Sequence, residues 1–379
     1  MLQVNGRDYA VPDRPVVVVC LDGSAIEYID AAAAAGAAPF LASLIAAGLC
    51  RRADAAVPTF TNPNNASIAT GVPPSMHGIT GNFFLDRETG RAVMMNDASF
   101  LRAPTILSAC AHAGLDAAAV VAKDKLRRLL FAGLEGESVS AEQDGIAVYS
   151  AQLSEHTLRR GVELMRTERP DVMYLSTSDF VQHAHAPGTA AANAFYQAID
   201  GQLALLDSFD VSMVVTADHG MTAKTDQDGR PQIIFLADLC DRWLGAGAAS
   251  VILPITDPYV GHHGSLGSFA WIYTSADVRP LTARLREVAG IDALVAADEA
   301  CARFELPRDR VGDLAVIADR DHVIGARPGD HDLTALHGPL RSHGGLAERA
   351  VPMLFNRPPR REVPNLRNTD AFWMAFNVL

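Results

Sequence analysis

The sequence has few cysteines, and their spacing carries no motif. The five cysteines of this 379-residue chain stand singly in mostly apolar surroundings, and no Cys-x-x-Cys spacing occurs. A disulfide framework would need paired cysteines, and a thiolate zinc site would need clustered ones. Neither is indicated, and we expect reduced, buried thiols.

Long hydrophobic runs and an excess of positive charge are also missing. No stretch approaches the roughly 18 apolar residues of a membrane-spanning helix, and residues 1–15 contain no apolar signal-peptide core. The formal net charge of −12 argues against binding to nucleic acid or to an anionic membrane. We therefore expect a cytoplasmic protein that attracts an anionic substrate by local positive charge, from metal ions or a few lysines.

The chain does contain enough apolar sequence for a large folded protein. Hydrophobic residues make up 49% of it and charged residues 20%, as is typical of globular proteins. A chain of 379 residues exceeds what one hydrophobic core usually holds. We expect a large domain with a smaller one inserted into it.

Apolar runs alternate with helical periodicity through the first 224 residues. The run from Val16 to Leu21 is rich in β-branched residues, which is typical of a fully buried parallel strand. This alternation predicts an α/β fold, with a doubly wound, mostly parallel sheet and helices on both faces. The predicted strands are 16–21, 53–57, 117–122, 171–175 and 212–216, and the predicted helices are 31–47, 105–115, 150–166 and 189–206.

The pattern changes near residue 225 and indicates a smaller α+β unit. We expect residues 1–224 and 336–379 to form the metal-binding core and residues 225–335 to form an inserted cap. The elements predicted in this half are strands 268–273, 291–296 and 312–318, helix 278–288, and a last core strand at 350–355.

A polar turn from Pro58 to Asn65 opens into a short helical run that ends at Gly71. Asn62 is a favoured N-cap residue and Pro63 suits the first helical position, so Thr61 is expected just outside a helix N-terminus. Free N–H groups and the helix dipole favour an anion there, including a phosphorylated threonine. The alternative is an ordinary capped helix, because threonine and asparagine are common cap residues.

Acidic and histidine side chains follow the ends of several predicted strands. Because the carboxyl ends of parallel strands meet at one edge of a sheet, we expect these side chains to converge near Thr61. Imidazole and carboxylate together suit zinc, and the set is large enough for two ions. Taken singly, each acid has an alternative role in a helix cap or a turn. The side chains are Asp22, Asp179, His183, Asp218, His219 and His343.

Five ordered elements carry a resemblance to a known family. They are Asp22, then Pro58-Thr-x-Thr61-x-Pro-Asn with Thr70-Gly-x-x-Pro-x-x-His-Gly, then Asp179-x-x-x-His183, Ala217-Asp-His-Gly-Met, and His343-Gly-Gly. Their order resembles the alkaline phosphatase superfamily, most of all its nucleotide pyrophosphatase/phosphodiesterase branch. The resemblance implies an alkaline phosphatase-like core with two zinc ions, for which manganese or iron are alternatives.

The same resemblance implies a role for each of these residues. One ion would be held by Asp179, His183 and His343. The second would be held by Asp22, Asp218, His219 and Thr61, with Thr61 as the nucleophile. One position departs from the phosphodiesterases, which usually carry histidine after the Pro-Asn of the nucleophile motif, where this chain has Asn65. That departure disfavours a nucleotide substrate.

Three further features are Asn82, the Lys123-Asp124-Lys125 sequence and the stretch from Asp257 to Gly264. They make the chain most similar to the phosphonoacetate hydrolases of this superfamily, and the resemblance implies cleavage of phosphonoacetate to acetate and phosphate through a phosphothreonine. Heterolysis of a carbon–phosphorus bond leaves a carbanion that delocalises into the carboxylate, where Lys123 and Lys125 would stabilise it. Asn82 would donate to a phosphoryl oxygen, and His263 would contact the substrate.

Alternatives remain at several points. Lys123 and Lys125 could be solvated, and His262 could contact the substrate instead of His263. Other functions on the same fold are a phosphodiesterase or phosphomonoesterase, and a non-catalytic metal-dependent binding protein. The expected partner is a small anionic phosphonate, with no nucleic acid or membrane, and a homodimer is left open. The polar loop before His343 is expected to expose His331 and His337.

Overall fold

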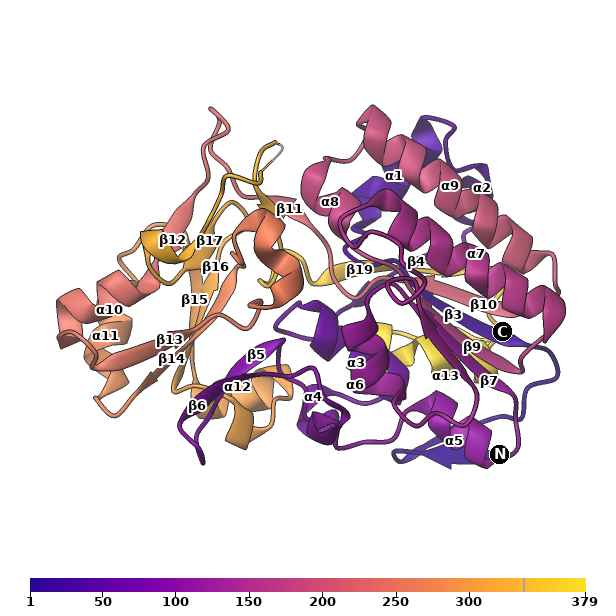
Figure 1. Ribbon diagram of the computed structural model, residues 1–379, viewed down its shortest axis with the longest axis horizontal. Coiled ribbons are helices and arrows are strands. Elements are labelled where there is room, and N and C mark those ends of the chain that lie inside the picture. The colour runs from indigo at the N-terminus through magenta and orange to yellow at the C-terminus, as the bar shows by residue number, and fades with distance from the viewer. Residues whose placement is uncertain (337) are drawn as a thin grey trace.

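The computed structural model describes residues 1–336 and 338–379, and its two largest sheets lie side by side (Figure 1). His337 is outside the described residues. Within them the larger sheet has seven strands, in the order β4-β19-β10-β3-β9-β7-β8, and every strand except β19 runs in the same direction. This is the predicted α/β class with a mostly parallel sheet. The strands are β3 (Val16–Cys20), β4 (Cys50–Asp54), β7 (Ala117–Val121), β8 (Glu137–Ser140), β9 (Val172–Ser176), β10 (Ser212–Thr216) and β19 (Ala350–Phe355).

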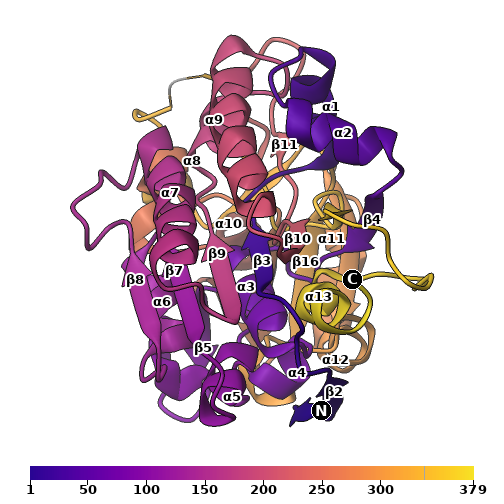
Figure 2. The same cartoon turned by 90° about the vertical axis from the view of Figure 1, so that its right-hand side faces the viewer.

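Helices cover both faces of this sheet, which explains why its central strands are apolar without alternation. All residues of β3, β7, β9 and β10 are buried. One layer of helices lies above the sheet in Figure 1 and another below it, and Figure 2 shows the layers from the side. The first layer is α1 (Ile26–Ala34), α2 (Pro39–Ala46), α7 (Ala151–Thr167) and α9 (Ala190–Asp207), and the second is α3 (Thr61–Thr70), α5 (Ile106–His112), α6 (Asp124–Phe131) and α13 (Ala371–Asn377).

The second sheet is antiparallel and has its own apolar cluster, in which Trp271 and Phe269 are buried. It lies at the opposite end of the molecule from the large sheet (Figure 1). The limits 225–335 that we assign to a cap stay a prediction. Its strands are β13 (Ala249–Ile252), β14 (Phe269–Thr274), β15 (Ile291–Ala296) and β16 (Leu314–Ala318), and its helices are α10 (Leu236–Leu244), α11 (Val278–Leu285) and α12 (Ala297–Phe304).

Several short elements join these parts. The short strands are β1 (Leu2–Val4), β2 (Arg7–Tyr9), β5 (Phe83–Asp86), β6 (Arg91–Met94), β11 (Thr222–Ala223), β12 (Ile233–Phe235), β17 (Val323–Gly325) and β18 (Arg341–Ser342), and the short helices are α4 (Pro74–His77) and α8 (Phe180–Ala184).

Within the described ranges, no single helix is long and apolar enough to cross a membrane. The bent pair α1 and α2 reaches that length only when joined across a bend of 106°.

The helix predicted at 31–47 is two helices, which corrects the sequence analysis. Gly36 adopts a φ of 70° after the end of α1, and Pro39 is the first residue of α2. Alanine suits every helical position, so the alanine run hid the break. The strand predicted at 53–57 corresponds to β4, which lies nearer the N-terminus. The pairing with β19 sets its limits, and Asp54 is the partner of Ala350.

The N-terminus of α2 receives its cap from another helix. The Asp200 carboxylate of α9 accepts hydrogen bonds from the backbone N–H groups of Phe40 at 3.0 Å and Leu41 at 2.8 Å. Asp200 is buried, and its negative charge lies at the positive end of the α2 dipole. This contact fixes α2 against α9 on one face of the sheet.

We expect Asp200→Ala to lower the free energy of unfolding by about 2 kcal/mol, because two buried N–H groups lose a charged acceptor. Denaturant unfolding measures the change. Gln197→Ala on the exposed face of the same helix is the control and should change it by less than about 0.5 kcal/mol. Equal losses in both variants would contradict the cap.

Candidate functional site

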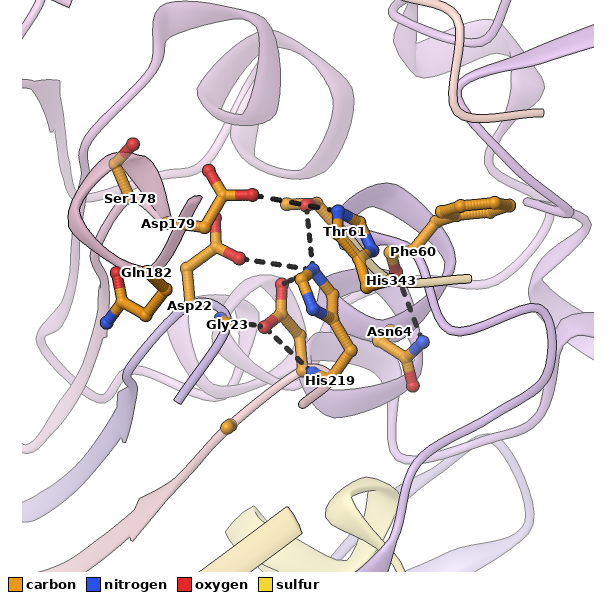
Figure 3. Close-up of polar contacts among 12 residues, drawn as sticks. Asp22, Gly23, Phe60, Thr61, Asn64, Ser178, Asp179, Gln182, His219 and His343 are labelled. Atoms are coloured by element: carbon orange, nitrogen blue, oxygen red, sulfur yellow. Dashed lines mark hydrogen bonds and ion pairs between the residues drawn. The ribbon is translucent and has the colours of Figure 1, made fainter. Parts of the chain in front are cut away.

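Three adjacent parallel strands deliver acidic side chains to one edge of the sheet. Asp22, Asp179 and Asp218 follow the carboxyl ends of β3, β9 and β10, which are neighbours in the sheet. All three carboxylates are buried, with exposures of 1%, 4% and 0%. Figure 3 shows Asp22 and Asp179 on the side of the site that faces Thr61, the first residue of α3. The predicted convergence at the carboxyl edge of the sheet is therefore what the structure shows.

Thr61 begins helix α3, and every residue of this helix is buried. The expected N-cap was wrong, because Phe60 holds that position and the Asn62 side chain instead donates to Met95 O at 3.0 Å. Thr61 still lies in the first helical turn, where backbone N–H groups lack helical acceptors. Its Oγ1 lies 3.4 Å from His219 Nε2. The hydroxyl thus faces the acids from the positive end of a helix.

The first group of candidate metal ligands is Asp179, His183 and His343. His183 Nε2 lies 3.0 Å from Asp179 Oδ2, and His343 Nε2 lies 3.7 Å from the same oxygen. Asp179 precedes α8 and His183 lies within it, so the spacing of four does place both on one side of a helix. Their donor atoms lie within 4.8 Å of one another, as a shared ion requires.

The second group surrounds His219. Its Nε2 lies 3.3 Å from Asp22 Oδ1 and 3.7 Å from Asp218 Oδ2, in addition to the contact with Thr61. Asp22 Oδ1 is buried and has no hydrogen-bond partner among the described residues. Such a carboxylate oxygen normally has a partner, so it marks a place where a cation fits.

The three histidine rings are held in one orientation by the backbone. Nδ1 of His183 bonds to Arg341 O at 2.8 Å, Nδ1 of His219 to Gly220 O at 2.9 Å, and Nδ1 of His343 to Thr59 O at 2.8 Å. A carbonyl oxygen only accepts, so each Nδ1 carries a proton and each Nε2 is the nitrogen that faces the acids. The donor set and its orientation therefore fit two divalent ions that accept imidazole and carboxylate.

The charges of the site are unbalanced without cations. Burial raises the pKa of Asp22, and the carboxylates of Asp179 and Asp218 raise it further. Burial opposes protonation of His219, but Asp218 and Asp22 raise its pKa to about 10. Burial also favours protonation of Asp179, yet Lys123 and His183 hold its pKa well below the usual range. Protons and lysines thus supply part of the positive charge that these acids require.

Lys123 and Lys125 are buried beside the first group. Nζ of Lys123 donates to Asp179 Oδ1 at 3.2 Å, and Nζ of Lys125 donates to Asp257 Oδ2 at 2.7 Å. Their exposures are 8% and 3%, which excludes the solvated alternative. Burial would lower the pKa of Lys123, but Asp179 and Asp22 raise it, so this lysine is cationic. Burial lowers the pKa of Lys125, although Asp257 acts in the opposite direction. The cationic Lys123 and the buried amine of Lys125 therefore lie beside the candidate metal ligands.

Asn82 and His263 are buried, with atoms that lack partners. The Asn82 amide donates one N–H to Ile255 O at 3.1 Å, whereas Asn82 Oδ1 has no partner among residues 1–336 and 338–379. The His263 ring stacks on the His183 ring with centroids 4.1 Å apart, and neither of its nitrogens has a partner in that part of the chain. His262 meets the His183 ring edge-on at 5.1 Å. Both histidines lie against the first group, and their roles stay a prediction.

Sequence reasoning did not predict the contacts that Asp257 and Thr59 make. Asp257 precedes a short 3-10 helix (Pro258–His263) far from Lys125 in sequence, so no local signal points to the pair. The Thr59 hydroxyl accepts from Gly344 N at 3.0 Å and donates to Gly345 O at 2.9 Å. Its one signal was the Pro-Thr-x-Thr motif, in which Thr59 stands two residues before the expected nucleophile.

The prediction that His331 is exposed was wrong. His331 is half-buried, its Nδ1 bonds to Gly264 O at 2.7 Å, and its Nε2 accepts from Ala326 N at 2.8 Å. It helps to hold the loop that follows the 3-10 helix. His331 thus has a structural role at the edge of the site.

The sequence matches a known family over most of its length. Residues 16–345 match the family model described as type I phosphodiesterase / nucleotide pyrophosphatase. This range contains every candidate ligand named above, and it confirms the resemblance to the phosphodiesterase branch.

Solved structures with the same fold fall into two levels of similarity. Two crystal structures of phosphonoacetate hydrolase from Sinorhizobium meliloti 1021, in complex with phosphonoformate and with phosphonoacetate, are each 48% identical to this chain with a TM-score of 0.94. The match covers 99% of this chain and 98% of that one. Murine ectonucleotide pyrophosphatase / phosphodiesterase 5 is 19% identical, with a TM-score of 0.68 over 97% of this chain and 96% of that one. The murine protein shares the fold.

We expect Thr59→Val to loosen the His343 loop, because Gly344 N and Gly345 O lose their side-chain partner. The free energy of unfolding should fall by about 1–3 kcal/mol, and zinc affinity of the group containing His343 should fall by about tenfold. Denaturant unfolding and zinc titration of metal-stripped protein measure both effects. Thr59→Ser keeps the hydroxyl and should match the wild type, so identical behaviour of the two variants would contradict this role.

Proposed function

The chain belongs to the type I phosphodiesterase / nucleotide pyrophosphatase family, and from that premise we propose that it hydrolyses phosphonoacetate to acetate and phosphate. The observation that carries this proposal is the buried, cationic Lys123 in contact with Asp179, with Lys125 beside it. Phosphonoacetate carries a carboxylate in addition to its phosphoryl group, and this second anionic group is what such cations would bind. The 48% identity to a phosphonoacetate hydrolase supports the same substrate.

Two divalent ions would complete the site, and we propose zinc because imidazole and carboxylate ligands are mixed in it. Asp179, His183 and His343 would hold one ion, and Asp22, Asp218, His219 and Thr61 would hold the other. When bound, these ions would supply Lewis acidity and lower the pKa of a coordinated hydroxyl. Manganese or iron are the alternatives in the cell.

We propose that Thr61 Oγ1 attacks phosphorus and forms a covalent phosphothreonine. The bond between phosphorus and carbon breaks, and its electron pair leaves with the acetate carbon, which takes up a proton. Water then cleaves the bond between phosphorus and Thr61 Oγ1. The oxygen of the water remains on the phosphate, and the Thr61 hydroxyl is restored. Thr61 lies in the first turn of α3, so backbone N–H groups would lie near the transferred group.

The remaining residues would bind and orient the substrate. Lys123 and Lys125 would receive the carboxylate, where negative charge grows as the carbon–phosphorus bond breaks. Asn82 would donate its free N–H to a phosphoryl oxygen. The His263 ring, whose nitrogens have no hydrogen-bond partner among the described residues, would contact the substrate next to His183.

A second function on this site is hydrolysis of a phosphate diester or monoester. The same nucleophile and ligands serve any phosphoryl group, and the family description includes phosphodiesterases. A binding protein without catalysis is the third alternative. In that case Thr61 would not react with the bound molecule.

We expect phosphate release from phosphonoacetate to stop after treatment with a chelator and to return when zinc is added. A colorimetric phosphate assay measures both steps, and metal analysis of protein purified without added metal identifies the ion. Thr61→Ala should lower release by at least about 10³-fold and should abolish the phosphothreonine trapped by acid quench. Activity that survives the chelator contradicts the metal proposal, and undiminished Thr61→Ala activity contradicts the nucleophile.

Substitution of the lysines should separate phosphonoacetate from aryl phosphate esters. We expect Lys123→Ala and Lys125→Ala to lower kcat/KM for phosphonoacetate by about 10²–10³-fold, with less than about tenfold loss for an aryl phosphate, which has no carboxylate. Arg127→Ala, which removes a cation that pairs with Asp124 on the same helix, is the control. Equal losses for both substrates would mean that the lysines act only through Asp179 and Asp257.

A further inference from the structure

The Asn65 side chain lies at the centre of the site, and every hydrogen-bonding position of its amide is used. Its Nδ2 donates to Thr61 O at 3.0 Å and to Asp218 Oδ2 at 3.0 Å. Its Oδ1 accepts from the Tyr174 hydroxyl and the Ser176 hydroxyl, both at 2.7 Å. Asn65 is fully buried, so these four contacts account for the whole polar surface of the amide.

The orientation of this amide follows from its partners. A backbone carbonyl and an ionised carboxylate are both obligate acceptors, so the side facing Thr61 O and Asp218 Oδ2 has to be the NH₂ group. A flipped amide would place Oδ1 against two oxygens. The hydroxyls of Tyr174 and Ser176 therefore donate to Oδ1, and they fix the amide from the opposite side.

Asp218 receives a different kind of bond on each oxygen. Its Oδ1 accepts from the backbone N–H groups of Gly23 at 3.2 Å and His219 at 2.9 Å. Its Oδ2, which faces the His219 ring, has Asn65 Nδ2 as its hydrogen-bond donor. One direction on Oδ2 then remains for an ion, and the carboxylate cannot rotate without breaking bonds to both oxygens.

We propose that Asn65 is a positioning residue for the second metal group, which aims Asp218 Oδ2 and fixes the first turn of α3 that carries Thr61. The inference rests on the proposed metal roles of Asp218 and Thr61. Because Tyr174 and Ser176 belong to β9, the strand that leads to Asp179, the amide joins three of the segments that supply the site. A neutral donor does this without adding charge, so the acids keep their full negative charge for the ions.

The neighbouring Asn64 provides a matched control on the same helix. It too is a fully buried asparagine, and its side chain bonds to backbone atoms of Ala56 and Phe60 and to the side chain of Asn368. Figure 3 shows its amide turned away from the acids, toward Phe60. Asn64→Leu therefore costs a comparable number of buried hydrogen bonds without touching a ligand side chain.

The test is a zinc titration of the metal-stripped protein against a fluorescent zinc indicator. We expect the wild-type chain to take up two ions. Asn65→Leu should weaken one of the two sites by about 10–100-fold and leave the other within about twofold. Asn64→Leu should lower the free energy of unfolding but leave both affinities within about twofold. Equal weakening of both sites, or the same zinc affinities in the two leucine variants, overturns the inference.

Tyr174→Phe is a gentler variant, because it removes one hydroxyl and keeps the amide. We expect it to weaken the same site several-fold alone, and to have no further effect in the Asn65→Leu background, since the hydroxyl acts through the amide. Additive effects contradict the inference. No effect of Tyr174→Phe alone also contradicts it, and this outcome can be measured even if Asn65→Leu does not fold. A wild-type chain that binds fewer than two ions contradicts the metal proposal as well. If Asn65→Leu binds two ions with wild-type affinities, the inference about Asn65 is contradicted and the metal proposal is not.

Discussion

The burial of three carboxylates at one edge of the sheet is the constraint on which the rest of the site depends. A buried charge costs several kcal/mol unless other groups compensate it, and here Asp22, Asp179 and Asp218 meet in one place. Backbone N–H groups and Asn65 satisfy Asp218, and Lys123 pairs with Asp179. Asp22 keeps an oxygen without a partner in the described part of the chain. The compensation is incomplete in the chain by itself, which is the condition under which divalent cations bind tightly.

Different parts of the chain supply the chemistry and the substrate contacts. The core sheet delivers the acids from three adjacent strands, and α3 delivers Thr61 from the opposite direction. The segment that holds Asp257 and His263 connects β13 to β14 of the second sheet, and it contacts Lys125 and the His183 ring. This segment therefore contributes side chains beside Lys125 and His183 that the large sheet does not supply.

The sequence was sufficient for those features that depend on local pattern. The buried run at β3, the strand at β10 and the spacing between Asp179 and His183 each carry a periodicity or a motif, and the structure has all of them. The break between α1 and α2 was missed because the alanine run has no preferred face, although Gly36 and Pro39 were available signals. The residues chosen as ligands rested on order along the chain, and the structure brings them together.

Contacts between distant residues could not be predicted in this way. The bond from Thr59 to Gly345 crosses 286 positions, and the pair formed by Lys125 and Asp257 crosses 132. Such contacts exist only once the sheet has formed, and the sequence around either residue does not indicate which distant residue it contacts. The role of Asn65 was hidden for a related reason, because a buried asparagine in a helix looks like a cap residue until its four partners are known.

The choice of phosphorus compound depends on charge balance more than on the nucleophile. Asp179 forms an ion pair with Lys123, and Asp257 forms an ion pair with Lys125. If Asp179 shared its charge with a cation, as proposed, Lys123 would keep unpaired positive charge, and a carboxylate on the substrate would then pair with it. A phosphate ester without a carboxylate would leave Lys123 without an anionic partner. Lys123 would then not stabilise the charge that develops as the ester bond breaks. The lysines would therefore stabilise the transition state for one class of substrate, even though Thr61 and the ligands would act on many.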